Sequence, residues 1–232
     1  MRWWAWLSAL VGVAVIAGLG LWLRPGEGLL FPVARFPERY PVRGVDLSHH
    51  NGVVDFGLLA DAGIAFAYLK ATEGGDWSDP RYQANLEAAR AAGLRVGAYH
   101  FFTFCRPGLE QATHFLSTAE LTRPALPPAI DVEFGGNCRE APGRDEVRRE
   151  LGQFLEEVER RTGRTAVVYA TPEAKEAILG EVSRPLWFRS IAREPRIPWA
   201  FWQFDAAGRL KGVARPVDLD VFDGTLAELD AL

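Results

Sequence analysis

The sequence predicts an α/β fold: a single-domain, irregular (β/α) TIM-like barrel preceded by an N-terminal hydrophobic helix. About eight short apolar runs, rich in β-branched and aromatic residues, recur between residues 44 and 222 and predict strands. Amphipathic patterns between the earlier runs predict helices, and an uncharged stretch at 3–23 predicts the hydrophobic helix. Strands and helices that alternate within one domain of this size favour a closed parallel barrel over an open sheet.

The stretch 3–23 carries no charge, and at about 1.5 Å per residue it is long enough to cross a hydrocarbon core of roughly 30 Å. Trp residues at both of its ends resemble interfacial aromatic belts. A cleaved secretory signal is the alternative, although no convincing Ala-x-Ala cleavage site follows. We therefore expect 1–24 to be a transmembrane anchor or a signal segment, with membrane contact through 3–23. The domain is then anchored outside the cytoplasm, or secreted if the segment is cleaved.

Residues 25–41 mix Pro, Gly and charged residues without a sustained period and predict a linker, which leaves 42–232 for the domain. The predicted strands span 44–48, 64–71, 94–102, 129–133, 165–170, 185–188, 199–204 and 217–222. The predicted helices span 80–92, 109–121, 144–162 and 171–179, and Gly93 and Gly163 are placed to end two of them. Because helices are scarce in the later half, we expect an irregular barrel rather than eight equal β/α units.

The composition of the chain excludes some classes of function. Hydrophobic residues at 48% and charged residues at 24% are ordinary for a globular protein. A net charge of -4 offers no basic field for nucleic acid, which is not an expected partner. The His49–His50 pair completes no metal motif, and Cys105 and Cys138 match no zinc spacing, so neither a metal nor another cofactor is expected. In an exported protein the two cysteines favour one disulfide, with two separate buried thiols as the alternative.

Carboxylates gather where the predicted strands end, the side of a (β/α) barrel that carries function. Asp131 and Glu133 stand two apart on one strand, so both face the same way, with Cα atoms about 6.6 Å apart. Glycoside hydrolysis needs a protonated acid and an anionic partner, and neighbouring carboxylates can split their pKa values to supply both. Glu133, with the longer reach, is the predicted general acid, and Asp131 and Asp46 are expected to stay ionised and to raise its pKa by repulsion. The alternative is that Asp131 and Glu133 are salt-bridged residues at the barrel mouth.

Aromatic residues accompany these acids. They are Tyr68, Tyr99, Phe101, Tyr169, Trp187 and Trp202, within or near the strand ends. Flat apolar faces with polar tips suit sugar rings in a groove, although core packing explains most of them individually. His100 either donates a hydrogen bond in the cleft or is a satisfied structural histidine. The chain contains neither a Gly-x-Ser-x-Gly elbow nor a Gly-rich phosphate loop, which argues against a serine hydrolase and against phosphate chemistry.

Together these residues resemble the glycoside hydrolase family 25 lysozymes, the Chalaropsis-type N-acetylmuramidases. The resemblance rests on motifs in order, at 44–52 (GVDLSHHNG), 66–74 (FAYLKATEG), 92–101 (AGLRVGAYHF), 131–133 (DVE), 202–204 (WQF) and 217–220 (VDLD). They cover nearly all of 42–222. Two positions depart from the family pattern: Asn51 stands where Gln is frequent, and Phe204 stands where Tyr is frequent. Neither departure touches the predicted catalytic carboxylates.

The resemblance implies a retaining hydrolase without a cofactor, which cleaves the β-1,4 bond from N-acetylmuramic acid to N-acetylglucosamine in the glycan strands of peptidoglycan. It implies that Glu133 is the general acid/base and that Asp131 orients or stabilises the acetamido group of the substrate. Asp46 and Asp218 would be supporting carboxylates. Assistance by the acetamido group is favoured over a covalent ester intermediate. The implied substrate-binding residues are Tyr68, Glu73, Tyr99, His100, Tyr169, Trp202, Gln203 and Asp220.

The insertion at 134–138 follows the catalytic strand directly, and Cys105 follows the strand that ends near His100. If adjacent barrel strands carry them, a Cys105–Cys138 disulfide ties two active-site loops together and supports an outward-facing domain. Two other functions stay open: a non-catalytic protein that binds cell-wall glycan, and a hydrolase of another N-acetylated glycan such as chitin. We expect the protein to be a monomer.

Overall fold

A computed structural model describes residues 35–181, 183–191 and 193–232. The predicted anchor or signal segment at 1–24 and the linker up to residue 34 lie outside the described residues. The elements are, in chain order, β1 (Val42–Leu47), η1 (His49–Asn51), α2 (Phe56–Asp61), β2 (Ile64–Glu73), β3 (Trp77–Ser78), α3 (Tyr82–Ala91), β4 (Arg95–Phe101), α4 (Gly108–Thr118), β5 (Ala129–Val132), α5 (Arg144–Thr162), β6 (Val167–Ala170), α6 (Pro172–Ala174), η2 (Lys175–Leu179), β7 (Leu186–Arg189), β8 (Phe201–Gly208), β9 (Val217–Phe222) and α7 (Leu226–Ala231). Within these ranges, no helix is long and apolar enough to span a membrane.

Eight strands form a closed barrel. The hydrogen-bonded order runs β1-β9-β8-β7-β6-β5-β4-β2, and pairing of β1 with β2 closes the ring. The two-residue strand β3 pairs antiparallel with the end of β2, outside the ring. The predicted single-domain α/β barrel is therefore confirmed, and each of its eight predicted strands is present with ends that differ by a few residues.

The last barrel strand corrects the prediction of a wholly parallel barrel. β9 runs antiparallel to both of its neighbours, β1 and β8. Only residues 209–216 connect β8 to β9, and a parallel strand would need a crossover of about a dozen residues or more. Reversal of β9 brings its first residues, rather than its last, to the C-terminal ends of the other strands. Asp218 consequently pairs in register with Asp46 at the end of β1.

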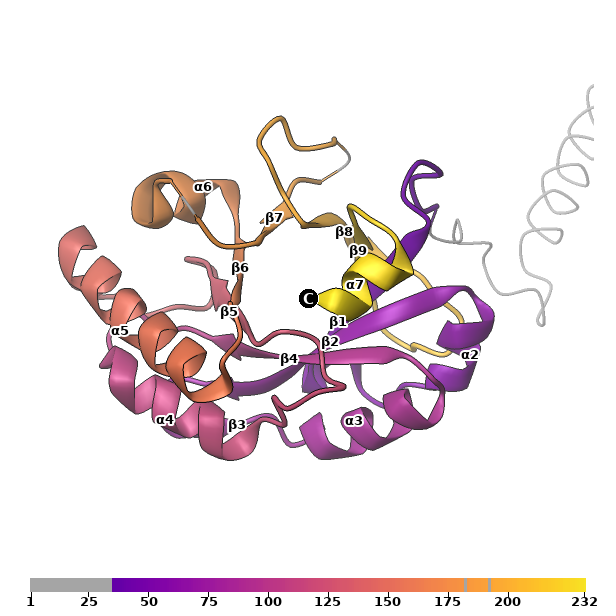
Figure 1. The fold of residues 1–232 in the computed structure, drawn as a ribbon, viewed down its shortest axis with the longest axis horizontal. Coiled ribbons are helices and arrows are strands. Elements are labelled where there is room, and N and C mark those ends of the chain that lie inside the picture. Colours follow the sequence, from indigo (N-terminus) through magenta and orange to yellow (C-terminus); the bar gives the residue numbers. More distant parts are fainter. Residues whose placement is uncertain (1–34, 182, 192) are drawn as a thin grey trace, which may run out of the picture. The chain divides into compact units, whose positions relative to one another are not determined.

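The helices cover mainly the first part of the barrel, as Figure 1 shows for α2 to α5. Helix α5 has the predicted bounds, and Gly163 ends it with φ 66°, a left-handed conformation that glycine adopts without strain. The helix predicted at 171–179 is divided into the short α6 and a π-helical turn, η2. No helix separates β7 from β8 or β8 from β9 in the described chain. The expected irregularity of the later half is therefore confirmed.

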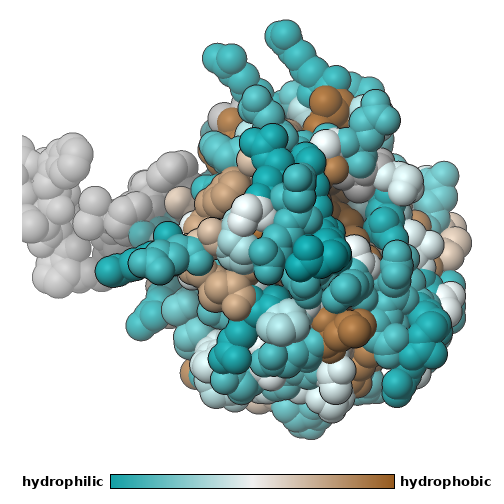
Figure 2. Space-filling view, turned by 90° about the vertical axis from the view of Figure 1, so that its left-hand side faces the viewer, coloured by the Kyte–Doolittle hydropathy of each residue, from teal (hydrophilic) through white to brown (hydrophobic). Residues whose placement is uncertain are grey.

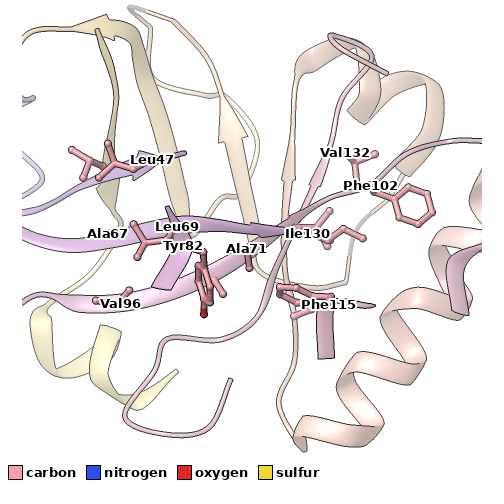
Figure 3. Packing of buried hydrophobic residues seen from close by; sticks show 14 of the residues in the cluster. Leu47, Ala67, Leu69, Ala71, Tyr82, Val96, Phe102, Phe115, Ile130 and Val132 are labelled. Atoms are coloured by element: carbon pink, nitrogen blue, oxygen red, sulfur yellow. The ribbon is translucent and has the colours of Figure 1, made fainter. Parts of the chain in front are cut away.

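Side chains alternate between the two faces of the barrel wall. Val45 and Leu47 of β1 belong to the outer core between barrel and helices, part of which is drawn in Figure 3, whereas Asp46 between them faces inward. A second cluster fills the interior and includes the rings of Phe66, Tyr68, Tyr99, Tyr169, Trp187, Phe201 and Phe222. Leu229 of α7 joins this cluster. Because the interior is a packed core, a ligand can reach inward side chains only at the barrel ends.

Residues 35–41, the last part of the predicted linker, contact the barrel wall. The rings of Phe36 and Phe204 lie 5.3 Å apart, and those of Tyr40 and Trp199 lie 5.1 Å apart. The Tyr40 hydroxyl also donates a hydrogen bond to Glu194 Oε1 at 2.6 Å. On the face drawn in Figure 2, apolar residues form separate patches among hydrophilic ones.

Candidate active site

A pocket of about 100 Å³ opens at the C-terminal ends of the parallel barrel strands. Its lining consists of Asp46, Tyr99, Asp131, Glu133, Tyr169, Trp187 and Gln203. These residues come from six strands and from the position directly after β5, and each occupies an inward position of the alternating pattern. Barrel closure therefore brings together residues that are up to 157 positions apart in the sequence, as for Asp46 and Gln203.

β5 supplies the pair of carboxyl groups that the sequence predicts. Ile130 and Val132 are buried in the outer core, which turns Asp131 and Glu133 toward the pocket. Asp131 Oδ1 is buried and has no hydrogen-bond partner in the described part of the chain. The Glu133 side chain is 22% exposed, and its Oε2 lies 3.9 Å from Arg189 Nη1. One face of the pocket therefore carries two neighbouring acids with few partners among the described residues.

A chain of hydrogen bonds connects the other side of the pocket. The Tyr169 hydroxyl donates to Gln203 Oε1 at 3.0 Å, and Gln203 Nε2 donates to Asp46 Oδ2 at 2.9 Å. Trp187 Nε1 donates to Asp220 Oδ1 at 2.8 Å. These bonds fix the rings and the amide that border the acids, because each polar tip has a defined partner.

Burial raises the pKa of every acid in this group. It is the largest cause for Asp46, where repulsion by Asp220 comes next, and for Asp131, where repulsion by Glu133 comes next. The pKa of Asp218 rises to about 8 because of burial and then of the Asp46 charge. The pKa of Asp220 is raised well above its usual range, again chiefly by burial.

The pKa of Glu133 is also raised. Burial is the largest cause, the positive charges of Arg189 and Lys70 oppose it, and the predicted repulsion within the pair raises the pKa of Asp131. Asp131 and Asp46 were expected to stay ionised, whereas their own pKa values are raised well above the usual range. That expectation is wrong because it ignored desolvation, which penalises each buried carboxylate before any repulsion acts. Because each ionised carboxylate raises the pKa values of its neighbours, the acids do not all carry a negative charge at the same pH.

Two cations face this acidic region, and the sequence analysis assigned a role to neither. Lys70 is buried, and its Nζ lies 2.6 Å from Glu73 Oε2 and 4.7 Å from the centre of the Phe101 ring. Glu73, a predicted binding residue, is 35% exposed at the end of β2. The position of Lys70 within an apolar strand could have indicated a functional residue, because buried lysines are rare unless they are paired. Arg189 at the end of β7 gave no such signal, since a charged residue that ends a strand usually faces solvent.

Five predicted substrate-binding residues do not line the pocket. Glu73 lies at the end of β2, and Asp220 is buried against Trp187; the other three are His100, Trp202 and Tyr68. His100 is fully buried on the outer face of β4, where it hydrogen-bonds with Thr72 Oγ1 (2.8 Å) and Gln111 Oε1 (3.1 Å), and burial lowers its pKa to about 3. Trp202 also faces outward, and its Nε1 donates to the Ser190 carbonyl. Both residues follow the alternation, because their neighbours Tyr99 and Gln203 occupy the inward positions.

Tyr68, the third of these residues, faces inward but lies deeper in the barrel. It is fully buried, and its hydroxyl donates to the Pro127 carbonyl at 3.3 Å. Trp187, whose ring centre lies 4.9 Å from that of Tyr68, reaches the pocket together with Tyr99 and Tyr169. Trp187 belongs to the aromatic residues predicted at the strand ends but not to the predicted site residues.

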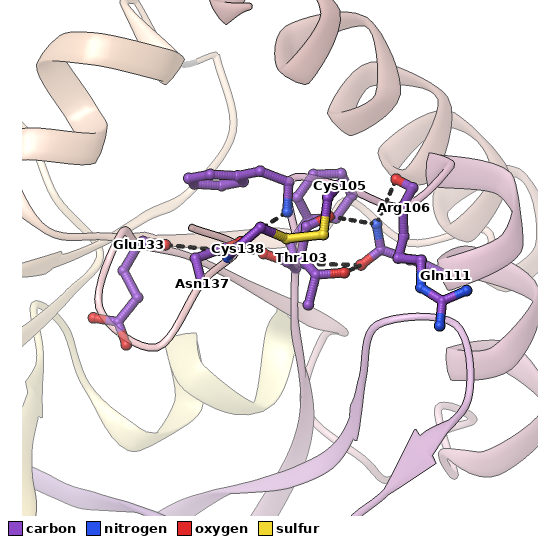
Figure 4. The surroundings of a disulfide bond; sticks show 9 residues. Thr103, Cys105, Arg106, Gln111, Glu133, Asn137 and Cys138 are labelled. Carbon is purple, nitrogen blue, oxygen red and sulfur yellow. Dashed lines mark hydrogen bonds between the residues drawn. A yellow bond between two sulfur atoms is a disulfide. The ribbon is translucent and has the colours of Figure 1, made fainter. Parts of the chain in front are cut away.

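A disulfide fastens the loop that follows Glu133. Cys105 and Cys138 are bonded, which confirms the predicted pair. Asn137 Nδ2 donates to the carbonyls of Phe102 and Glu133, and Asn137 Oδ1 accepts from the Phe104 amide, as seen in Figure 4. The loop after β5 is thus held to the loop after β4 by a covalent bond and two hydrogen bonds, and the third hydrogen bond closes the loop on the carbonyl of the predicted acid.

Comparison with known proteins decides the family. Residues 45–213 match the model of the glycosyl hydrolases family 25, over a range that includes every strand from β2 to β8. The chain belongs to glycosyl hydrolase family 25. As a family 25 member it is a glycoside hydrolase, and the resemblance noted from its motifs is confirmed.

Relatives of this family 25 chain are similar over most of its length. Lysozyme M1 of Streptomyces globisporus is 32% identical over 97% of this chain and 81% of its own length. The solved family 25 glycosyl hydrolase from Bacillus anthracis is 34% identical, with a TM-score of 0.80 over 88% of this chain and 99% of its own. The bacterial lysozyme from Streptomyces coelicolor is 33% identical, with a TM-score of 0.77 over 82% and 96%.

Proposed function

We propose that this family 25 hydrolase is an N-acetylmuramidase, which cleaves the β-1,4 bond from N-acetylmuramic acid to N-acetylglucosamine in peptidoglycan with retention of configuration. The observation that carries the proposal is the pair Asp131 and Glu133, which face one pocket from a single strand with few partners of their own. Relatives named as lysozymes in two Streptomyces species support the choice of polymer.

Glu133 is the proposed general acid/base. Burial and a second acid beside it keep a proton in the pair, and Glu133 is the member whose side chain is 22% exposed and can reach a bound glycan. It protonates the oxygen of the leaving N-acetylglucosamine as the C1–O bond breaks. Later it takes a proton from the water that attacks C1, so the residue ends the cycle in its starting state.

Asp131 is proposed to orient the acetamido group of the muramic acid unit. Its Oδ1 is buried without a partner among the described residues and can accept the amide N–H of the substrate. The acetamido carbonyl oxygen then attacks C1 from the face opposite the leaving group, and water later opens the cyclic intermediate, which gives retention. Asp46, which lines the pocket, and Asp218, which pairs with it in register, are the proposed supporting carboxylates. Tyr99, Tyr169 and Gln203 are proposed to contact the sugars.

We infer that the domain works outside the cytoplasm, where its substrate lies. The disulfide between Cys105 and Cys138 supports this location, because such bonds persist mainly in oxidising compartments. Anchoring through residues 3–23 and a monomeric state are parts of the same proposal.

The test is to incubate the purified full-length protein with purified peptidoglycan, to reduce the products with borohydride and to identify their reducing ends by mass spectrometry. Reduced N-acetylmuramic acid ends are expected. Parallel digestion of chitin separates a muramidase from a hydrolase of another N-acetylated glycan. Sedimentation with the wall without new reducing ends would instead indicate a non-catalytic glycan-binding protein.

A further inference from the structure

Arg189 occupies the inward position directly above Trp187 on β7. Trp187 lines the pocket, and two residues along the same strand Arg189 pairs in register with Gln203, another pocket residue. Since residues two apart on a strand face the same way, the guanidinium extends into the barrel mouth. There it lies 3.9 Å from Glu133 Oε2, on the opposite side of the opening from β1.

The guanidinium of Arg189 has no hydrogen-bonded partner of its own within the described chain. Its one ion contact is the 3.9 Å approach to Glu133, which exceeds hydrogen-bonding distance, and 38% of its side chain is exposed. Arg184, only five residues earlier, instead binds Glu159 through two hydrogen bonds of 2.7 and 2.9 Å. Arg189 therefore keeps its full set of donors for a ligand, whereas Arg184 is a structural residue.

A second pocket begins at Arg189. Its volume is about 320 Å³, and it is lined by Thr171, Pro172, Glu173, Arg189, Ser190 and Ile191, which follow the ends of β6 and β7. The second pocket lies next to the acidic site along the chain, because Tyr169 of β6 and Trp187 of β7, two residues before Thr171 and Arg189, line the first pocket. Glu173 is the only other charged lining residue, and no ion pair joins it to Arg189 among the described residues.

We infer that Arg189 binds a carboxylate of the glycan, namely the free lactyl carboxylate of an N-acetylmuramic acid unit. This inference rests on the proposed muramidase function. A guanidinium binds carboxylates through paired hydrogen bonds, and a peptide-free glycan strand has no other acidic group than its lactyl carboxylates. The lactyl group belongs to the same sugar as the reacting C1, and Arg189 lies beside the acid that acts at that bond.

The neighbouring acids permit an anion here. Glu133 and Asp218 lie close enough to Arg189 for its charge to lower their pKa values, yet burial keeps both values above the ordinary range. A raised pKa reduces the negative charge that these acids carry, and with it their repulsion of a carboxylate and their neutralisation of Arg189. The charge of Arg189 also lowers the pKa of Glu133, whereas a general acid needs a raised pKa. This opposition argues that Arg189 has a role other than adjusting the pKa of Glu133.

The inference places the enzyme after another reaction. In peptide-bearing strands the lactyl carboxyl group forms an amide bond with the stem peptide, so it carries no charge. A free lactyl carboxylate arises when that amide is hydrolysed. A hydrolase of the amidase class, which removes stem peptides, must therefore supply the strands that Arg189 recognises best.

The test compares matched substrates and variants of the full-length protein. Peptide-free glycan strands are divided into two batches, one with free lactyl carboxylates and one in which they are converted to neutral primary amides; peptide-bearing strands form a third batch. Arg189→Gln removes the charge, Arg189→Lys keeps it without the paired donors, and Arg160→Gln on α5 is the control for loss of an arginine. KM, kcat and the pH profile are measured from new reducing ends.

We expect the wild-type protein to have a KM roughly ten- to a hundredfold lower for the carboxylate strands than for the amide strands. Arg189→Gln should abolish this difference with little change in kcat, Arg189→Lys should restore part of it, and Arg160→Gln should retain it. Glu173→Gln should lower KM for the carboxylate strands, because it removes the negative charge from the second pocket.

Other outcomes overturn the inference. If Arg189→Gln weakens both batches alike, or only shifts the pH profile for both, Arg189 acts through Glu133 and not on the carboxylate. A loss confined to peptide-bearing strands would mean that the anion belongs to the stem peptide. If the wild-type protein cleaves none of the three batches, the proposed muramidase function itself fails, which is distinguishable from failure of the role of Arg189.

Discussion

Replacement of Glu133 by Gln is expected to remove activity and preserve the fold. Gln has nearly the same size and can keep a polar contact with Arg189, but it cannot donate a proton to the leaving oxygen. General acid catalysis contributes about 10²–10⁴-fold, and the same residue is proposed to act again as the base, so kcat should fall by on the order of 10³ or more. Binding of glycan should change little, because the shape of the pocket is kept.

The stability of Glu133→Gln follows from the surroundings of the carboxyl group. Burial raises the pKa of Glu133, so its ionised form is less stable in the folded protein than in the unfolded chain at neutral pH. The partner that opposes this, Arg189, is 38% exposed and 3.9 Å away, and such a pair contributes at most about 1 kcal/mol. The free energy of unfolding should thus change by less than about 1 kcal/mol at pH 7, toward greater stability.

The assay combines reducing-end kinetics on purified peptidoglycan with thermal unfolding at pH 7 and pH 5. The gain in stability should shrink at pH 5, because the wild-type Glu133 is then protonated in a larger fraction of molecules. Glu140→Gln, at an exposed position of the same loop region, is the matched control and should leave kcat unchanged. A kcat within tenfold of the wild-type value would refute the assignment, and a large fall in Tm would show that Glu133 is a structural residue.

Three further predictions concern the same end of the barrel. The folded pKa of Asp218 is about 8, so the folded state retains a proton that the unfolded chain releases near pH 4. The free energy of unfolding should therefore fall as the pH rises from about 4 to about 8. Asp218→Asn should reduce the difference in Tm between pH 5 and pH 8. Loss of the disulfide in Cys105→Ser/Cys138→Ser should lower the free energy of unfolding by about 4 kcal/mol for a separation of 33 residues. Chemical denaturation should therefore show a lower midpoint, and the activity of the variant should be reduced. Tyr169→Phe removes the donor to Gln203 and should cost about 1 kcal/mol in stability, with KM raised more than kcat is lowered; an unchanged denaturation midpoint would contradict the hydrogen bond.

The sequence predicted the barrel because its strands are short, apolar and separated by clear helical patterns. It also predicted Asp131 and Glu133, since the spacing of two residues on a strand fixes a common face whatever the rest of the fold does. The same rule could have refined the list of binding residues. Tyr99 and His100 are neighbours on one strand, so only one of them can face the barrel axis, and the same holds for Trp202 and Gln203.

Two features depended on closure of the barrel and could not be obtained from local patterns. Arg189 becomes part of the site only because β7 stands close enough to β5 for the guanidinium to reach Glu133. The direction of β9 was not apparent from the predicted strands, because those at 199–204 and 217–222 leave 12 residues, about enough for a crossover; the extension of β8 to Gly208 shortens the connection to residues 209–216. Burial of the acids, which controls their pKa values, could not be judged before the neighbouring rings were placed.

The pocket carries a stability cost that its packing alone does not explain. Elsewhere the barrel interior consists of tightly packed rings, yet at this end acidic residues take inward positions where burial raises their pKa values. The hydrogen bond from Gln203 satisfies one oxygen of Asp46, whereas Asp131 Oδ1 stays buried without a donor among the described residues. Apolar side chains of similar size would fill these positions at less cost. Acids that the fold itself does not satisfy are best explained by a polar ligand, and the N–H and O–H groups of an N-acetylated sugar can supply the missing donors.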